Sequence, residues 1–469
     1  MASQQGEVPA SFRDPSGFVF LEDGQVYRQV NRYYQEDFDH LVNSGLHHEL
    51  VRDGMLIPHA EVGLQHAVTE DAYKVIRPQP IPFVSYPYEW CFSQLQAAAL
   101  LTLSIQAKAL EYGMSLKDAS AYNIQFAGGK PVLVDTLSFE IYCEGQPWVA
   151  YRQFCQHFLA PLALMRYVDV RLSQLFRVFL DGIPLNLARR MLPRRTQANF
   201  GLLTHIHLHA KAQERFANTP VASTGRKVGR TAFLGLLDSL RSTTEKLKWQ
   251  PGGTDWHDYY DISSYSDAAM KHKKQLVAEM LDRITPVPSS VWDLGANTGV
   301  FGRLASDRGI PTICLDLDPA ATESNYLASL ETAEQNILPL IMDLTNPSPG
   351  IGWAHRERMS LVERGPADVV IALALVHHLA IANNLPFNRI ARFLGLLCHT
   401  LIIEYVPKSD SQVQRLLSSR KDIFDKYDQG SFDREFGAFF EIVYSAPIMD
   451  TERTLYLMTR GRKDCAQDP

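Results

Sequence analysis

The feature that most constrains the fold of this chain is the string VWDLGANTG at residues 291–299. An apolar run ends at Asp293, and Gly295 and Gly299 frame a tight turn into an expected helix. Glycines at such a turn let a ligand approach the backbone closely. A dinucleotide site requires the spacing G-x-G-x-x-G. The spacing G-x-x-x-G, with an acid two residues before the first glycine, favours a ligand that carries an amino group and no pyrophosphate.

Apolar runs and helical patterns alternate through residues 251–469. Leu276, Val277, Met280, Leu281 and Ile284 fall on one face of an expected helix at 266–284. Five apolar runs follow as expected strands, and the late runs EIVYSA and TLYLMT are typical of an antiparallel hairpin. Strands that alternate with helices form a mostly parallel, doubly wound sheet. The sequence therefore predicts an α/β fold for 251–469.

Polar residues follow the next three expected strands. Asp316 lies 21 residues after Gly295, where a carboxylate accepts both ribose hydroxyls in nucleoside-binding folds of this topology. Asp343 ends the third strand, where a carboxylate can receive an adenine amino group. The fourth strand is followed directly by His377 and His378.

These features, in this order, resemble the class I S-adenosylmethionine-dependent methyltransferases, whose sheet is Rossmann-like and seven-stranded. The resemblance covers 251–469 and implies S-adenosylmethionine as the cofactor. It implies that the loop acid contacts the methionine amino group, that the next strand's acid holds the ribose, and that the third faces the adenine. The residues so assigned are Asp293, Gly295, Asn297, Gly299, Asp316 and Asp343.

The string WHDYYDISSY at 256–265 resembles the lid that such enzymes fold over the cofactor, with Tyr265 as the candidate contact. Ordinary core packing of these aromatic residues is the alternative.

Methyl transfer from a sulfonium is an in-line displacement, so the enzyme aligns the nucleophile and, for a hydroxyl, removes its proton. His377 and His378 are candidate bases because histidine titrates near neutral pH, and His377 is slightly favoured as the first after its strand. Packing beneath the sheet is the alternative for one of the pair. Glu404, after the fifth strand, is a second candidate base or orienting group, with a rim carboxylate as the alternative.

The string N/D-P-P-Y, which marks amino-group methylation in this family, is absent, and Ala372-Leu-Ala-Leu stands in its place. By elimination, the sequence favours an oxygen acceptor on a small molecule or glycan. Three other functions stay open: a bifunctional kinase-methyltransferase, a non-catalytic cofactor-binding module and a protein methyltransferase.

Residues 1–185 are expected to form an α+β domain. Asp118 and Asn123 keep the D-x-x-x-x-N spacing of the catalytic loop of protein kinases and aminoglycoside phosphotransferases, and Asp135 follows an expected hairpin. This resemblance implies ATP and magnesium, if the loop is active. Leu116 replaces the usual histidine, and neither a Gly-rich loop nor a DFG string is present. Turn capping by Asp118 and Asn123 and a degenerate kinase-like docking scaffold are the alternatives.

Taken whole, with the strings SYPYEW and LKDASAYN, the chain resembles a bacterial two-part family of nodulation-protein-like methyltransferases with a kinase-like N-terminal region. The acceptors implied by that resemblance are undefined.

Residues 186–250 are expected to be a basic connecting segment of irregular structure, because Lys and Arg predominate from 186 to 230 and Glu214 is the single acid there. A basic rim that attracts an anionic acceptor is the alternative. His205, His207 and His209 alternate as in some metal-binding strands, but no carboxylate supports them, so we expect no metal site.

Bulk composition restricts the remaining classes. The net charge of −6 excludes a generic nucleic-acid binder. The six cysteines show no CxxC pair, which is typical of free thiols. The N-terminus lacks a signal pattern, and residues 92–110 are too polar to span a bilayer. We therefore expect a cytoplasmic protein.

Overall fold

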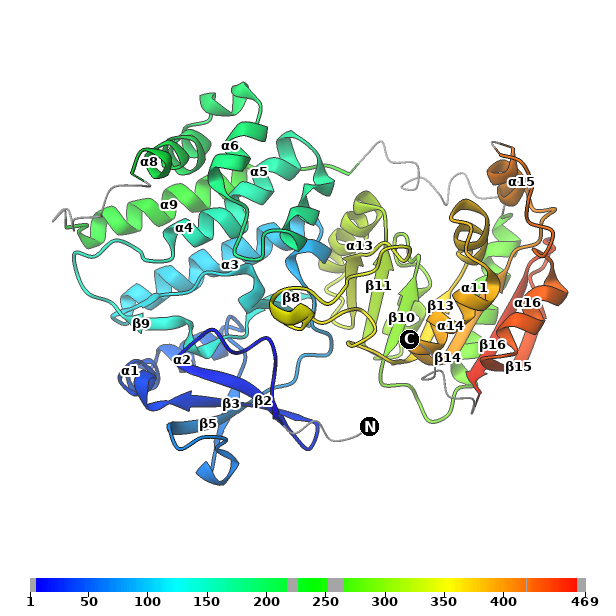
Figure 1. Ribbon diagram of the computed structural model, residues 1–469, viewed down its shortest axis with the longest axis horizontal. Coiled ribbons are helices and arrows are strands. Elements are labelled where there is room, and N and C mark those ends of the chain that lie inside the picture. The colour runs from blue at the N-terminus through cyan, green and yellow to red at the C-terminus, as the bar shows by residue number, and fades with distance from the viewer. Residues whose placement is uncertain (1–5, 217–226, 252–264, 419, 462–469) are drawn as a thin grey trace. The chain divides into compact units, whose positions relative to one another are not determined.

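The computed structural model describes residues 6–216, 227–251, 265–418 and 420–461. The chain divides into two compact units (Figure 1). Unit 1 comprises Met1–Gln250 and Ile351–Arg358, and unit 2 comprises Pro251–Gly350 and Met359–Pro469.

Unit 2 is built on a seven-stranded sheet with the order β12-β11-β10-β13-β14-β16-β15. Neighbouring strands among the first five run parallel, and β16 is antiparallel to both of its neighbours (Figure 1). The mostly parallel sheet predicted for 251–469 is therefore confirmed, with its terminal hairpin. The strands are β10 (Val291–Leu294), β11 (Thr312–Asp316), β12 (Ile337–Ile341), β13 (Ala367–Ala372), β14 (Cys398–Tyr405), β15 (Phe440–Pro447) and β16 (Thr454–Arg460).

The helix predicted at 266–284 is confirmed as α11 (Asp267–Asp282). The Ser266 side chain caps it by accepting a hydrogen bond from Ala269 N at 3.1 Å, which satisfies one of the free donors of the first turn. Its apolar face packs into the core formed by the strands, where Val277 meets residues such as Val291 and Ile371. The other helices of unit 2 are α12 (Gly302–Ser306), α13 (Pro319–Glu331), α14 (Phe387–Leu397), α15 (Ser411–Leu417) and α16 (Gln429–Phe436).

The strands β10 and β13 lie side by side in the centre of this sheet. From β10 the chain passes outward through β11 to β12, and then returns to β13 on the other side of β10. Ligands bind at such a reversal, beyond the carboxyl ends of the strands, because the connecting loops diverge there and leave a crevice.

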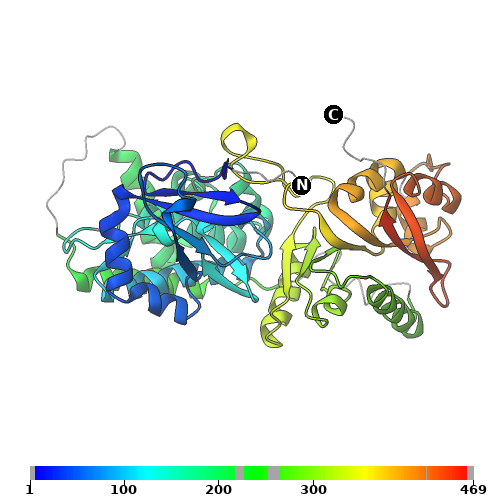
Figure 2. The ribbon, with the colours of Figure 1, turned by 90° about the horizontal axis from the view of Figure 1, so that it is seen from below.

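Unit 1 contains a five-stranded antiparallel sheet with the order β1-β2-β3-β5-β4. Its strands are drawn in blue in Figure 2 beside the helices α1 (Gln35–Asn43) and α2 (Leu46–Arg52). Two of these strands form a hairpin that turns at Asp23 and Gly24, and both turn residues have the positive φ that tight hairpins require. The strands are β1 (Gly6–Glu7), β2 (Gly17–Glu22), β3 (Gln25–Asn31), β4 (His59–Val62) and β5 (Ala72–Pro78).

The segment at 92–110, too polar to span a bilayer, lies in the long helix α3 (Phe92–Glu111), and Gly113 follows its end with a φ of 70°. The hairpin expected before Asp135 is confirmed, with β7 (Ile124–Ala127) and β8 (Lys130–Leu133) joined through Gly128 and Gly129. A short pair, β6 (Met114–Leu116) and β9 (Phe139–Ile141), lies on either side of it in sequence.

The expectation that 186–250 is an irregular connection is wrong for most of its described residues. They form helices within unit 1, and α9 (Arg230–Lys246) buries Phe233, Leu237 and Leu240 at helical spacing. Lys and Arg are concentrated before this helix, from 186 to 230, and that charge favoured a linker interpretation for the whole segment. The helices after α3 are α4 (Tyr151–Phe154), α5 (Ala160–Tyr167), α6 (Leu185–Met191), α7 (Phe200–Leu202), α8 (His209–Phe216) and α9.

Candidate functional site

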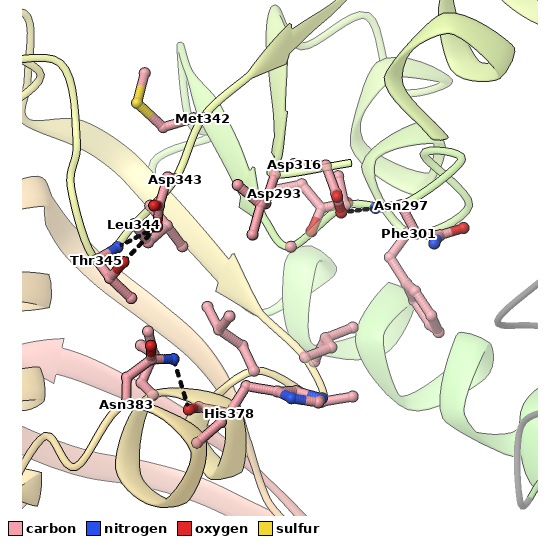
Figure 3. A pocket seen from close by; sticks show the side chains of 18 of the residues that line it. Asp293, Asn297, Phe301, Asp316, Met342, Asp343, Leu344, Thr345, His378 and Asn383 are labelled. Carbon is pink, nitrogen blue, oxygen red and sulfur yellow. Dashed lines mark hydrogen bonds between the residues drawn. The ribbon is translucent and has the colours of Figure 1, made fainter. Parts of the chain in front are cut away.

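A cavity of about 250 Å³ lies beyond the carboxyl ends of β10, β11, β12 and β13 in unit 2 (Figure 3). Its described walls come from the glycine loop after β10, the ends of β11 and β12, the segment after β13, and α11. The candidate cofactor residues of the sequence analysis that line it are Tyr265, Asp293, Gly295, Asn297, Asp316 and Asp343.

The loop after β10 takes a conformation that depends on its glycines. Gly295 and Gly299 have φ values of 73° and 80°, in the left-handed region that disfavours a side chain. A Cβ atom at Gly299 would also lie 2.4 Å from the side-chain amide nitrogen of Asn325. The loop therefore turns tightly enough to bring backbone atoms to the cavity.

Asp293 ends β10 as a buried carboxylate, with 3% of the residue exposed. Its Oδ2 atom has no hydrogen-bond partner among the described residues. Burial raises the pKa of Asp293 to about 7, because the charged form is poorly solvated. A buried acceptor without a partner is costly in a native protein, so this atom indicates a donor group that a ligand supplies.

Asp316 ends β11 and is held by the backbone. Its Oδ2 accepts a hydrogen bond from Asn297 N at 2.7 Å, drawn dashed in Figure 3, and its Oδ1 accepts one from Asp318 N at 2.8 Å. Burial raises the pKa of Asp316 to about 6. These bonds fix the carboxylate at the cavity wall and lock it to the glycine loop.

Asp343, together with Met342 and Leu344, forms the wall that follows β12 (Figure 3). Its Oδ1 accepts hydrogen bonds from both the backbone N and the hydroxyl of Thr345, at 2.8 and 2.6 Å. A carboxylate that is flanked by the side chains of Met342 and Leu344 suits a flat heterocycle that carries an exocyclic amino group.

The two histidines after β13 have different surroundings. His378 lines the cavity and begins a π-helical turn, η11 (His378–Ala382), whereas His377 is completely buried and does not line it. The preference for His377 as a base is therefore corrected in favour of His378. Burial lowers the pKa of His378 to about 4, so its ring is neutral at physiological pH.

Glu404 is not available as a free base, which corrects that half of its assignment and leaves the orienting role. It is completely buried on β14 and forms ion pairs with Lys273 at 2.6 Å and Arg453 at 3.3 Å. Burial alone would raise the pKa of Glu404, but these two cations lower it. The carboxylate also accepts a hydrogen bond from Ala374 N at 2.8 Å, and Ala374 has a φ of 49°. Glu404 therefore holds the cavity segment after β13 in an unusual conformation.

Tyr265 joins this network through its hydroxyl, which donates to Glu404 and accepts from Arg453 Nη1 at 2.6 Å and Lys273 Nζ at 3.1 Å. The remainder of the proposed lid, residues 256–264, lies outside the described residues. Lys273 was not predicted, although its spacing of three from Leu276 puts it on the apolar face of α11. Arg453, in the turn before β16, gave no comparable signal.

Unit 1 brings the three kinase-like residues near one another around the β7–β8 hairpin. Asp118 Oδ1 accepts from Ser120 N at 2.9 Å, and Asp135 pairs with Arg28 at 2.7 Å. Burial raises the pKa of Asp118, and the charge of Asp135 raises it further. Asn123 bonds the Ser138 hydroxyl at 3.2 Å. Asp118 thus caps a local turn, as the turn-capping alternative expects, whereas Asn123 bonds a side chain and Asp135 accepts a hydrogen bond from Leu137 N at 2.9 Å.

The three alternating histidines lie in a π-helical turn, η9 (Leu203–Leu208), and at the start of α8. His205 bonds Tyr151 and Ser239, while His207 bonds Thr196. Within the described ranges, no group of three or more His, Cys, Asp or Glu residues is arranged to hold a metal ion. Nor is any helix in those ranges long and apolar enough to cross a membrane.

Comparison with known proteins gives one strong match in sequence. The chain is 36% identical over 468 residues to the nodulation protein NoeA of Rhizobium meliloti (strain 1021), which covers 98% of this chain and 97% of that protein. No family model matches.

Likenesses to solved structures are weaker. The bifunctional kinase-methyltransferase WbdD is 15% identical with a TM-score of 0.30, over 46% of this chain and 44% of that one. Magnesium protoporphyrin IX methyltransferase (ChlM) of Synechocystis PCC 6803, solved with bound SAH, is 15% identical with a TM-score of 0.31, over 44% and 93% respectively.

Proposed function

The chain belongs to the family of the nodulation protein NoeA, and we propose that it is an S-adenosylmethionine-dependent methyltransferase that acts on an oxygen of a small molecule or glycan. The observation that carries the proposal is the buried, unpartnered Oδ2 of Asp293 at the wall of the cavity. The Gly302 backbone stabilises the charged form of this carboxylate, and no described residue bonds Oδ2 in ordinary hydrogen-bond geometry, so a ligand with a cationic amino group fits it by charge and by hydrogen bonding.

The other walls fit the rest of that cofactor. Asp316 is a carboxylate for the ribose hydroxyls, and Asp343 lies between apolar side chains suited to an adenine ring. When bound, S-adenosylmethionine supplies a methyl group on a sulfonium, which is already activated for displacement. The protein's own contribution is then to orient the acceptor and to receive its proton.

His378 is the residue proposed to receive that proton. It lines the cavity on the segment after β13, on the opposite side from Asp343 (Figure 3). Its ring is unprotonated at neutral pH because burial lowers its pKa to about 4. A hydroxyl that loses its proton as the carbon–oxygen bond forms becomes much more acidic in the transition state, so a weak base suffices.

An oxygen acceptor is favoured by the segment Leu373–Leu375. Its side chains are those of Leu, Ala and Leu, so this segment offers no side-chain oxygen to hold an amino group. Its backbone donor at Ala374 is already bonded to Glu404. The acids Asp293 and Asp316 lie at the glycine loop, in the part assigned to the cofactor.

The test is calorimetric titration with S-adenosylhomocysteine, which carries the same amino group. We expect micromolar binding by the native protein. Asp293→Asn keeps the shape and removes the charge, and it should weaken binding about 10- to 100-fold, the effect of losing one charge-assisted hydrogen bond. Asp307→Asn, a change of an exposed carboxylate in the same unit, is the matched control and should bind normally. Equal affinity in native protein and Asp293→Asn would reject the assignment of Asp293.

A further inference from the structure

Unit 2 contains a second hollow, of about 480 Å³, which the proposed chemistry does not use. It lies where the start of α14, the segment 423–427 and α16 come together. Two of its lining residues are fixed by neighbouring parts of the chain: Asn384 Oδ1 accepts a hydrogen bond from Arg420 at 3.2 Å, and the Tyr427 hydroxyl donates to Val406 O at 2.7 Å. The hollow is therefore a built feature of the fold.

Aromatic and amide groups share the lining. Phe387 and Tyr427 are buried, with ring centroids 5.1 Å apart. Phe424, three residues before Tyr427, is half-buried and also lines the hollow. Asn384 and Asn388 also line the hollow and are exposed to solvent. The lining thus combines apolar ring surfaces with planar groups that both donate and accept hydrogen bonds.

The charges around the hollow cancel. Two carboxylates and two cations line it: Asp425, Glu435, Lys426 and Arg434. Arg434 and Glu435 also pair with each other at 3.2 Å. An anionic ligand would gain no net attraction there. A wholly apolar ligand would remove water from the Asn384 and Asn388 amides without replacing its hydrogen bonds. A neutral ligand with apolar faces and a hydroxyl edge can pack against the aromatic rings and hydrogen-bond to the amides. A sugar ring has this character.

The hollow and the cofactor cavity are lined in part by the same segment of the chain. Leu379, Ala382 and Asn383 line the cavity, while Ala380, Asn384 and Leu385 line the hollow. One short segment, which begins at His378, therefore contributes to both. His378 does not line the hollow, so a ligand that fills the hollow and also presents a hydroxyl to His378 extends beyond the hollow.

We propose that this hollow is an acceptor subsite that binds a neutral oligosaccharide, with one ring against Phe424 and a neighbouring hydroxyl directed to His378. The inference deepens the proposed function and rests on it for the reaction, whereas sugar binding itself does not require the cofactor.

The experiment is binding of the full chain to an array of neutral and anionic oligosaccharides and their monosaccharides. Asn388→Ala and Phe424→Ala are compared with native protein, and Val443→Ala is the matched control because Val443 is an exposed apolar residue that lines neither hollow. We expect binding to neutral oligosaccharides, weakened about tenfold by each hollow variant and unchanged in the control. Calorimetry with S-adenosylhomocysteine should give native affinity for all three variants.

The outcomes separate the two proposals. If no neutral oligosaccharide binds, if only anionic sugars bind, or if Asn388→Ala and Phe424→Ala bind like the native protein, the subsite is rejected. If sugar binding depends on Asn388 and Phe424 but S-adenosylhomocysteine does not bind, the subsite stands and the methyltransferase proposal fails. Because Asn388 is exposed, its truncation should not impair folding, and normal cofactor affinity in that variant checks this point.

Discussion

At the scale of single residues, the buried carboxylate of Asp293 lowers the free energy of unfolding at high pH and is also the proposed contact for the cofactor's amino group. An unfolded aspartate has a pKa of about 3.9, and burial raises the pKa of Asp293 in the fold to about 7. The folded state thus prefers the protonated form, so this group favours folding at low pH and loses that effect as pH rises through 7. Asp293→Asn, which is neutral at every pH, should therefore raise the melting temperature at pH 8 and change it much less at pH 5. Thermal unfolding at both values measures this, and an equal shift at both would contradict the stated cause.

The same ionisation predicts how cofactor binding varies with pH. A cationic amino group is best held by the charged carboxylate, so affinity for S-adenosylhomocysteine should fall as pH drops below 7, by up to about tenfold per pH unit. Titrations between pH 5.5 and 8 follow this change. The variant Asp293→Asn should lose the dependence, whereas Asp307→Asn should keep it. A flat profile in the native protein would remove Asp293 from the amino-group site.

The neighbouring histidines should respond differently to truncation. His378→Ala removes a cavity side chain, so turnover should fall, by about 100-fold for a lost general base, while cofactor affinity persists. His377→Ala leaves a void in a fully buried position, so its main effect should be a lower melting temperature. Methyl-transfer rates and thermal unfolding of both variants distinguish these roles. Full activity in His378→Ala would show that no base is needed there.

At the scale of elements, α11, β14 and the β15–β16 turn are joined by a buried ionic network. Lys273 comes from α11, Glu404 from β14, and Arg453 from the turn, and each is at most 2% exposed. Removing one partner leaves a buried charge poorly compensated, so Lys273→Met should lower the free energy of unfolding by about 3 kcal/mol. The double variant Lys273→Met with Glu404→Gln should lose less than the sum of the single changes. Urea denaturation of the four proteins tests this cycle, and strict additivity would contradict a direct coupling.

The same elements show what the sequence could and could not predict. The strands of unit 2 and the glycine loop were predictable because apolar runs and glycine spacing are local signals. Helix α9 was missed because the basic run before it resembles a linker, although Phe233, Leu237 and Leu240 keep helical spacing. Glu404 was a candidate orienting group, but its partners could not be predicted, since they are 131 and 49 residues away in sequence. Contacts at such distances exist only once the sheet has formed.

At the scale of the whole molecule, the kinase-like residues should be independent of cofactor binding. All described residues that line the cofactor cavity lie between Tyr265 and Asn383, whereas Asp118 belongs to unit 1. Asp118→Asn keeps the oxygen that accepts from Ser120 N, so local structure should persist. Affinity for S-adenosylhomocysteine should stay within about twofold of native, as for changes at distant sites. The bifunctional alternative instead requires magnesium-dependent ATP binding that Asp118→Asn abolishes, and the same calorimeter can detect it.

One short segment, Ile351–Arg358, belongs to unit 1, although the residues on both sides of it belong to unit 2. Within unit 1, Arg13 donates to both carboxylate oxygens of Glu357, at 2.8 and 3.0 Å, and the guanidinium of Arg358 lies 4.3 Å from the centroid of the Tyr122 ring. Residues 353–356 are exposed, so the segment presents Arg356 to trypsin while Glu357 anchors its end.

Loss of that anchor should loosen the segment without affecting the cofactor cavity. Glu357→Gln retains one acceptor oxygen but loses the charge that Arg13 pairs with, so local opening becomes easier. Trypsin should then cleave after Arg356 about fivefold faster than in native protein, if opening precedes cleavage. Glu334→Gln, which breaks the comparable pair with Arg303 in unit 2, is the control and should leave this cleavage rate unchanged. Equal rates in Glu357→Gln and native protein would mean that the Arg13 pair does not hold the segment, and that the contact of Arg358 with Tyr122 suffices.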